Sequence, residues 1–315
     1  MLNKICRVSF CVPIILNMIA LFPFTTHQAV EFNNLPNVSL TSNVELTMIS
    51  EQLFNKASHE LFSYVHINYQ GQTSLKNFTD NALERLLNAS SNAFLTSTTK
   101  SLIKLFDNYE LNTSQPEIVT KQKDTEENEF IDNLMKTDVM LDVMHFLSLK
   151  GFFKNDIQAY KNTLKEIWFH LYSRTKGING SSGFEHVFIG ERKPRKGITG
   201  LHNWISFFFG ELSNTINYFG FSRSKEFVNK AVILETYFTY LGKQKMSSMF
   251  IGTSPELEIA VYTLCFFIRP NKRCKMSFMG FKFDIQTYTI QNNGKKLLAT
   301  AFPVLKNTNC HLICK

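Results

Sequence analysis

The 315-residue sequence predicts an α+β protein, with a helical N-terminal lobe followed by a β-rich lobe. Apolar residues recur at helical spacing from about residue 46 to 175. After residue 180 apolar and polar residues alternate, and Asn293-Gly294 separates two such runs, which indicates a β-hairpin. We therefore expect the helical lobe at about 46–178 and the β-rich lobe at about 179–306.

Four segments of the first lobe carry the helical spacing. They cover residues 81–95, 99–111, 128–151 and 159–174. Gly151 is placed to end the third of these helices, because a glycine readily takes the left-handed conformation that follows a helix.

The second lobe mixes both patterns. The segments 183–191 and 232–242 are expected as strands, and 201–212 as a helix with one apolar stripe. A further helix is expected at 253–268, where Ser254 is placed to cap, Pro255 occupies the first helical position and Glu256 faces the helix dipole. The strands 281–290 and 295–305 form the expected hairpin.

The N-terminus has the layout of a signal peptide, assigned to residues 1–29. A basic start precedes an apolar run that is interrupted by Pro13, Asn17 and Pro23. The interruptions and the short run favour a signal over a membrane anchor, so we expect a secreted protein with no stable membrane span. Residues 30–45 are polar and are expected to be an extended lead-in.

Cysteines and glycosylation sequons agree with export. Cys6 and Cys11 would leave with the signal, and four cysteines remain, two of them in the tail 307–315. These four are Cys265, Cys274, Cys310 and Cys314. They are expected in disulfides whose pairing the sequence leaves open, and no Cys-x-x-Cys spacing supports zinc. The candidate glycosylation sites are Asn37, Asn77, Asn88, Asn112 and Asn179.

Positive charge gathers in the second half of the chain. The formal charge is +8, but residues 1–175 carry a net −3 and residues 176–315 a net +11. A cationic half suits an anionic partner such as RNA, anionic lipid or glycan. A solvated basic surface without a partner is the alternative.

Two histidines in the basic half suggest a catalytic pair. His186 lies in the expected strand 183–191, and His202 lies in the first turn of the expected helix 201–212. The segment between them can fold back and bring the two imidazoles together. Imidazoles transfer protons near neutral pH, which is what RNA cleavage by its own 2′-hydroxyl requires. The alternative is that both histidines are structural.

The basic turn between the histidines is expected to line the path of the RNA phosphates. It contributes Arg192, Lys193, Arg195 and Lys196. The alternative for this turn is a solvated loop without substrate contact.

Three stretches in the right order resemble the EndoU (XendoU-type) poly(U)-preferring endoribonucleases. They are GFEHVFIGE (183–191), GLHNWI (200–205) and FIGTSPELEIAVYTLCF (250–266). The same catalytic module occurs in the coronavirus uridylate-specific endonuclease. LFDNYE (105–110), the segment 126–140 and IWFHLY (167–172) resemble the helical lobe of the animal enzymes, so the resemblance covers roughly 46–306.

The resemblance implies an EndoU-like α+β fold and cleavage of single-stranded RNA at uridines, leaving 2′,3′-cyclic phosphate ends. It also implies stimulation by Mn²⁺, or by Ca²⁺, and we expect a monomer. Two alternatives stay open. One is a secreted RNA-binding protein of the same fold with little or no turnover, and the other is a lipid- or glycan-binding protein.

The resemblance also implies roles for individual residues. His186, His202 and Lys245 fall on the family's catalytic residues, with Leu201 in place of the usual Phe before the second histidine. The family more often has one more residue after its lysine, so Lys243 is a rival to Lys245. Ser248 falls on a serine that contacts uracil. Glu185 and Glu191 fall on glutamates associated with activity.

One position departs from the family pattern. The family usually has Tyr-Pro in its last strand, whereas this chain has Phe302-Pro303. An aromatic ring can still stack on a base or ribose. The missing hydroxyl puts the positioning of uridine in doubt, rather than cleavage itself.

Position and charge assign the acid and the base. His202 is expected to act as base, because the positive end of a helix dipole disfavours imidazolium. His186 is expected to act as acid, because Glu191 or another nearby carboxylate favours its protonated form. Lys245 would stabilise the charge on the phosphoryl oxygens.

Overall fold

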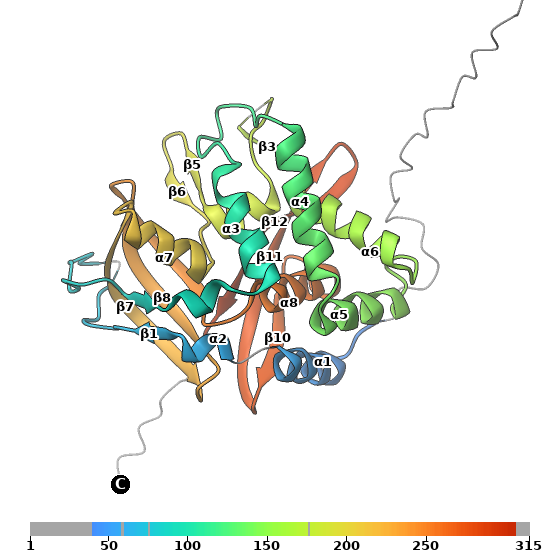
Figure 1. Cartoon of the computed structure of the whole chain (residues 1–315), viewed down its shortest axis with the longest axis horizontal. Helices are drawn as coiled ribbons and strands as arrows, with labels where there is room; N and C mark the ends of the chain where they lie inside the picture. Colours follow the sequence, from blue (N-terminus) through green and yellow to red (C-terminus); the bar gives the residue numbers. More distant parts are fainter. Residues whose placement is uncertain (1–39, 58–59, 75, 176, 307–315) are drawn as a thin grey trace, which may run out of the picture. The chain divides into compact units, whose positions relative to one another are not determined.

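The computed structural model describes residues 40–57, 60–74, 76–175 and 177–306. The expected α+β class is confirmed. Helices come mainly from the first half of the chain and antiparallel strands from the second (Figure 1). The signal peptide, Asn37, Cys310 and Cys314 lie outside the described residues.

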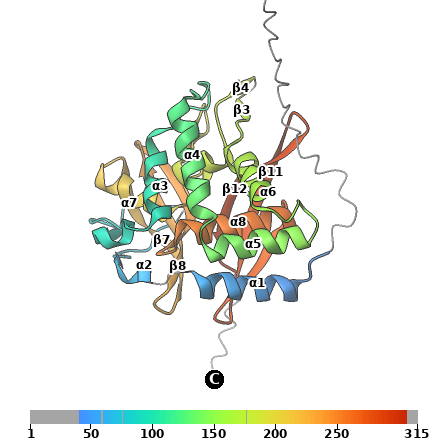
Figure 2. The same cartoon turned by 45° about the vertical axis from the view of Figure 1, so that its right-hand side comes forward.

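Before residue 165 the described part of the chain contains six α-helices, which are labelled in Figure 2. They are α1 (Asn43–Lys56), α2 (Glu60–Ser63), α3 (Ser97–Lys104), α4 (Lys121–Leu134), α5 (Asp138–Leu149) and α6 (Ile157–Leu164). Side-chain oxygens cap several of them, since Ser42, Thr96, Thr120 and Thr137 accept backbone N–H groups at helix starts. Gly151 follows α5 with a φ of 87°, as expected for a helix end.

The helix expected at 81–95 is wrong. This segment contains the strand β2 (Leu87–Ala89), paired with β1 (Val65–Ile67), and a short 3₁₀ turn at Ser91–Phe94. The carboxylate of Glu211 accepts hydrogen bonds from the backbone N–H groups of Leu86 at 2.7 Å and Leu87 at 3.1 Å. These donors are therefore used by a distant residue instead of a helix.

In the described part of the second half, most of the long strands form two antiparallel three-stranded sheets (Figure 1). The first joins β7 (Ile216–Phe227), β8 (Ala231–Tyr240) and β9 (Lys243–Ile251). The second joins β10 (Arg273–Phe278), β11 (Phe281–Asn292) and β12 (Lys295–Val304). Asn293 and Gly294 both have positive φ, 49° and 79°, in the turn between β11 and β12. The hairpin predicted from Asn-Gly is thereby confirmed.

Three short antiparallel pairs and two helices complete the described part. The remaining strands are β3 (Ser173–Thr175), β4 (Ile178–Asn179), β5 (Glu191–Lys193) and β6 (Gly197–Thr199). The helices are α7 (Trp204–Leu212) and α8 (Pro255–Ile268). Ser254 and Pro255 take the predicted positions at the start of α8, although the Ser254 hydroxyl makes no capping bond.

The hydrophobic core is continuous across the two expected lobes. Helix α8 is buried along nearly its whole length and packs against α5 and β11, while α1 packs against β10. A disulfide between Cys265 of α8 and Cys274 of β10 joins two of these elements. Helical and β-rich segments thus support each other, and the site below rests on a packed scaffold.

Candidate active site

The segment around His186 is a turn of π-helix, Glu185–Ile189, and not the expected strand. The alternation of Phe184, His186 and Phe188 is misleading, because every residue from 181 to 190 is buried. The rings of Phe184 and Phe188 stack with centroids 4.9 Å apart, as helical neighbours do. π-Helical turns are rare and often occur at functional sites.

A small hairpin returns the chain from one histidine to the other. Strands β5 and β6 pair antiparallel, and the basic turn comprises the end of β5 and the residues that join it to β6. The backbone N–H of Leu201 then donates to the carbonyl of His186 at 2.9 Å, and that of His202 donates to the carbonyl of Val187 at 2.7 Å. The expected return path is present, and backbone hydrogen bonds fix it.

Gly200 makes this close approach possible. Its φ is +78°, and a Cβ at this position would lie 1.9 Å from the carbonyl oxygen of His186. The next residue, Leu201, also has a positive φ of 56°, which is uncommon for a non-glycine residue. The connection therefore requires a glycine and holds Leu201 in a strained conformation.

His202 lies just before α7, and not in its first turn as expected. Asn203 is the N-cap of this helix, and its side-chain oxygen accepts the N–H groups of Ile205 and Ser206, each at 3.1 Å. The two imidazole rings nevertheless come together, with centroids 6.2 Å apart. Both rings line one cavity of about 580 Å³, termed here the histidine cavity.

Positive side chains dominate the histidine cavity. Its charged and aromatic lining consists of Arg174, His186, Lys193, His202, Arg223, Glu235, Lys245, Arg273, Tyr288 and Phe302. Glu235 is paired with Arg223, whose Nε lies 2.7 Å from its Oε2. Cationic walls around two imidazoles suit an anionic substrate such as RNA.

Glu191 orients the first imidazole. Its Oε2 lies 2.8 Å from Nδ1 of His186, and its Oε1 accepts from Nε of Arg174 at 2.8 Å. Burial raises the pKa of Glu191, but His186 and Arg174 together lower it to about 2. The resulting carboxylate can only accept, so Nδ1 of His186 carries the proton and Nε2 is left for the cavity.

Burial lowers the pKa of His186 to about 4, and the neighbouring Glu191 opposes this effect without overcoming it. The expectation that a carboxylate favours the protonated form is therefore right in direction and insufficient in size for the free protein. A phosphate in the cavity would act in the same direction as Glu191.

The second imidazole has the opposite environment. Its Nδ1 lies 3.0 Å from the carbonyl oxygen of Ser248 and 2.9 Å from Oγ of Ser247, which itself donates to the carbonyl of Leu201. Both partners accept, so Nδ1 of His202 donates and Nε2 presents a lone pair. Burial holds the pKa of His202 well below its ordinary value, and Lys245 lowers it further. A neutral imidazole results, by burial and charge rather than by a helix dipole.

Lys245 lines the histidine cavity from β9, whereas Lys243 is exposed at the start of this strand and does not line it. Among the described residues no carboxylate pairs with Lys245. Burial lowers the pKa of Lys245 to about 8, and Lys193 adds to the effect. The position favours Lys245 over its rival.

The other predicted side chains are only partly brought to the cavity. Lys193 lines it, and Lys196 lines a smaller adjoining hollow of about 270 Å³. Arg192 and Arg195 are exposed and line neither space. Ser248 and Phe302 line the histidine cavity, and the Ser248 hydroxyl donates to the carbonyl of Pro303.

Glu185 does not line the histidine cavity. Its carboxyl group is buried, and burial, followed by the charge of Glu191, raises its pKa well above the ordinary value. Within the described residues neither of its side-chain oxygens has a hydrogen-bond partner.

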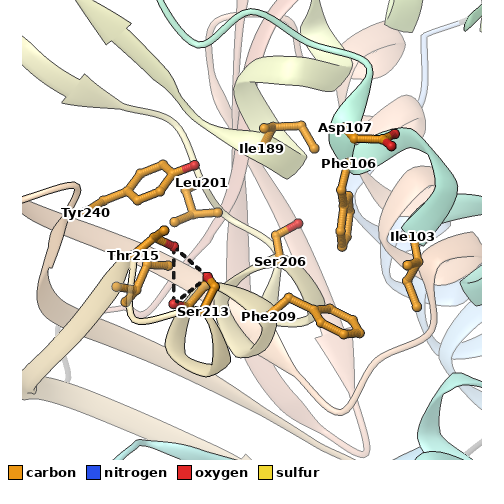
Figure 3. Close-up of a pocket in the computed structure, with 12 residues that line it drawn as sticks. Ile103, Phe106, Asp107, Ile189, Leu201, Ser206, Phe209, Ser213, Thr215 and Tyr240 are labelled. Carbon is orange, nitrogen blue, oxygen red and sulfur yellow. Dashed lines mark hydrogen bonds between the residues drawn. The ribbon is translucent and has the colours of Figure 1, made fainter.

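A second, apolar cavity of about 450 Å³ lies beside the catalytic loops (Figure 3). Ile189 and Leu201 line it together with Phe106 and Phe209. Its only charged lining residue is Asp107. An apolar space with a carboxylate does not suit RNA phosphates, so the histidine cavity is the better candidate site.

Comparisons with known proteins agree with this geometry. The family described as Endoribonuclease XendoU matches residues 45–303. The chain belongs to the endoribonuclease XendoU family. It is similar to uridylate-specific endoribonuclease D of Xenopus laevis, with 37% identity over 276 residues that span 83% of this chain and 89% of that protein.

Other members of the XendoU family give a similar picture. The uridylate-specific endoribonuclease of Bos taurus is 36% identical over 270 residues, which span 82% of this chain and 65% of that protein. A solved structure is titled "The structure of XendoU: a splicing independent snoRNA processing endoribonuclease". It superposes with a TM-score of 0.68 at 30% identity and covers 86% of this chain and 100% of that one. The expected family, its α+β fold and its enzyme class are confirmed.

Several residues around this XendoU-type site were not singled out from the sequence. Arg174 contacts Glu191 and lines the cavity, yet no motif marks it. Asn203 is bonded to Glu258 of α8 at 3.2 Å, and Thr253 donates to the same carboxyl group at 2.7 Å. Asn203 and Glu258 both stand inside quoted stretches, 200–205 and 250–266, but their contact is evident only from the folded structure.

The described residues do not fit a resident metal ion beside the histidine pair. Among them no group of three or more His, Cys, Asp or Glu side chains is arranged to hold one. The cavity wall is cationic, and its Glu235 is engaged by Arg223. Nothing in the mechanism below is therefore routed through Mn²⁺ or Ca²⁺.

Proposed function

We propose that this chain is a secreted endoribonuclease that cleaves single-stranded, uridine-rich RNA at uridylates. The proposal rests on two imidazoles that line one cationic cavity. The Nδ1 atom of each is hydrogen-bonded to an acceptor. Within the described residues no hydrogen bond reaches either Nε2. One atom to accept a proton and one to deliver it are thus available. The specificity for uridylate is supported by the similarity to proteins named uridylate-specific endoribonucleases.

The reaction is an internal transphosphorylation. Nε2 of His202 takes the proton of the uridine 2′-hydroxyl, and the 2′ oxygen attacks the neighbouring phosphorus. The bond from phosphorus to the 5′ oxygen breaks, and Nε2 of His186 delivers a proton to that leaving oxygen. Lys245 stabilises the charge on the non-bridging oxygens. The products are a 2′,3′-cyclic phosphate and a free 5′-hydroxyl.

Each role has a physical reason. His202 is neutral because of burial and Lys245, as a general base must be before the reaction. His186 has Glu191 on its Nδ1, and the phosphate of bound RNA adds a further negative charge that raises its pKa. Phe302, Ser248 and Lys193 line the same cavity and would hold the uridine and its phosphates.

The decisive experiment uses two matched oligonucleotides with a single ribouridine or a single deoxyuridine at the same position. The ribo substrate should be cut after uridine, and mass spectrometry should find a cyclic phosphate. Equal cleavage of the deoxy substrate would exclude attack by the 2′-hydroxyl. Binding of the ribo substrate without turnover above a His202→Ala control would leave an RNA-binding protein of the same fold.

Stimulation by Mn²⁺, or by Ca²⁺, is kept as a measurable part of the proposal. Initial rates on the ribo substrate are compared in Mn²⁺, Ca²⁺ and a chelator at constant ionic strength. We expect faster cleavage with the ion. Equal rates in all three conditions would remove metal stimulation and leave the histidine chemistry in place.

Secretion is supported by the N-terminal layout and by the Cys265–Cys274 disulfide, since disulfides persist in oxidising compartments. No helix in the described part of the chain is long and apolar enough to cross a membrane. Asn77, Asn88 and Asn179 are exposed, and Asn112 is half-buried. We expect secreted material to behave as a monomer in gel filtration, to carry glycans at exposed sequons and to contain no free thiol. An unglycosylated protein with free Cys265 and Cys274 would contradict export.

A further inference from the structure

A second basic space lies next to the histidine cavity. It measures about 640 Å³ and is termed here the basic hollow. Its charged and aromatic lining is Phe221, Arg223, Lys225, Phe281, Lys282 and Lys306. No carboxylate is among its lining residues. A volume of this order accommodates a nucleotide-sized ligand.

The basic hollow adjoins the histidine cavity. Arg223 lines both spaces from β7. The end of β12 runs from one to the other, because Phe302 lines the histidine cavity and Leu305 and Lys306 line the basic hollow. A strand of RNA that leaves the catalytic pair along β12 therefore enters the basic hollow.

The hollow combines cations with an exposed aromatic ring. Nζ of Lys225 lies 3.8 Å from the centroid of the Phe281 ring, and Phe281 is 36% exposed. Lys282 is exposed beside it. Single-stranded nucleic acids bind grooves that pair lysine or arginine with aromatic faces, because phosphates contact the cations and bases stack on the rings.

We propose that the basic hollow binds a nucleotide of the substrate strand next to the scissile uridine. Its base would pack against Phe281, and its phosphate would contact Lys225 and Lys282. This subsite rests on the proposed function and extends it, because it makes the enzyme prefer an extended single strand over a dinucleotide.

Charge alone would also attract a sulfated glycan. The aromatic ring inside the hollow favours RNA, since nucleobases stack on aromatic faces. Heparin therefore serves as the competing probe.

The test compares substrates that differ in length. One is uridylyl-adenosine, and the other two are twelve-residue oligodeoxynucleotides with a single ribouridine near the 5′ end or near the 3′ end. The test variants are Lys225→Gln/Lys282→Gln and Phe281→Ala. The matched control, Lys100→Gln/Lys154→Gln, removes the same charge from exposed positions that line neither space. Thermal unfolding confirms that each variant is folded.

Wild type should cleave one of the two twelve-mers with a lower KM than the dinucleotide. The position of the ribouridine in that twelve-mer identifies which side of the cut enters the hollow. Both test variants should raise that KM about tenfold, with a smaller change for the dinucleotide. The control should change neither value.

Binding of an all-deoxy twelve-mer gives an independent readout. Removing the contact to this one phosphate should reduce the slope of log affinity against log salt by about 0.7. Equal losses for short and long substrates, an unchanged slope, or a loss confined to heparin binding would overturn the subsite. If wild type cleaves nothing, the proposed function fails, and the slope still decides the subsite.

Discussion

The ring of Phe302 lies stacked on the imidazole of His202, with centroids 4.8 Å apart and planes inclined by 22°. The residue that stands where the family usually has tyrosine thus contacts the proposed base directly. It packs on one face of the imidazole whose Nδ1 is held by Ser247 and Ser248. Phe302 therefore orients His202 as well as lining the cavity.

Replacing Phe302 should separate stacking from the missing hydroxyl. Phe302→Leu removes the ring and should lower kcat/KM about tenfold, since an aromatic contact contributes up to about 1.5 kcal/mol. Phe302→Tyr restores the family's residue and should stay within about threefold of wild type. The preference for uridine over cytidine is measured for both variants. A large loss of kcat/KM in Phe302→Tyr would show that the site does not accommodate the additional hydroxyl group.

The two histidines should respond differently to a substrate whose leaving group needs no proton. On uridine 3′-(p-nitrophenyl phosphate), His186→Ala should recover much of the wild-type rate, because nitrophenolate leaves without an acid. His202→Ala should stay inactive, because the 2′-hydroxyl still needs a base. Rates are followed by nitrophenolate absorbance. The reverse pattern would exchange the two roles, and equal rescue of both would remove the assignment.

Glu191 is a positioning residue for the acid. In Glu191→Gln the amide oxygen still accepts from Arg174, but the negative charge beside His186 is lost. The pKa of His186 should therefore fall further, because this charge no longer opposes the effect of burial. We expect kcat/KM on RNA to fall by up to about 100-fold, with a greater loss at higher pH. A role only in folding would lower activity on the nitrophenyl substrate equally, whereas loss of acid function would be rescued there.

Lys245 should give the pH profile an alkaline limb. Its pKa of about 8 means that the ammonium loses its proton as pH rises through 8, and the cation facing the phosphoryl oxygens is lost. kcat/KM should therefore fall above about pH 8, and Lys245→Arg should move that limb upward because guanidinium stays charged. Lys245→Ala should lower kcat/KM by about 100-fold or more. Lys243→Ala is the control, and a comparable loss there would restore the rival.

The sequence predicted the elements whose pattern is local. Gly151 at the end of α5 and the Asn293-Gly294 turn depend on backbone preferences of one or two residues, and both are in place. The failures have a tertiary cause. The backbone N–H groups of Leu86 and Leu87 are captured by Glu211, more than a hundred residues away, and no periodicity in 81–95 indicates this.

For the site as well, local patterns were predicted from the sequence and tertiary contacts were not. His186, His202 and Lys245 stand in recognisable stretches, and the cavity brings them together. The strand predicted around His186 is wrong. Every residue from 181 to 190 is buried, so the alternation of residue types there does not distinguish a strand from a helix. Arg174 carries no motif, and it contacts Glu191 across 17 positions of the chain. Glu258 contacts Asn203 across 55 positions, so both contacts depend on packing.

Glu258 should lower the free energy of unfolding as pH rises, which is the opposite of what a carboxylate with a lowered pKa does. It is buried in α8, and burial raises its pKa to about 8 from an ordinary value of 4.5. Between these values the unfolded chain has lost the proton and the folded chain still holds it. The folded state therefore binds more protons, and its stability falls as pH rises from 4.5 to 8, by up to about 1.4 kcal/mol per pH unit.

Two substitutions at Glu258 test this linkage and its origin. Glu258→Gln removes the ionisable group and can still accept from Asn203 or Thr253, so its free energy of unfolding relative to wild type should be higher at pH 8 than at pH 5. Glu258→Ala removes the same proton but leaves both donors unpaired inside the protein, which costs about 1–3 kcal/mol at every pH. Urea unfolding at the two pH values measures both. A difference between Glu258→Gln and wild type that does not change with pH would mean that Glu258 is already ionised in the folded protein. The side chain of Asn203, which caps α7 just after His202, would then donate to a buried carboxylate and not to a neutral carboxylic acid.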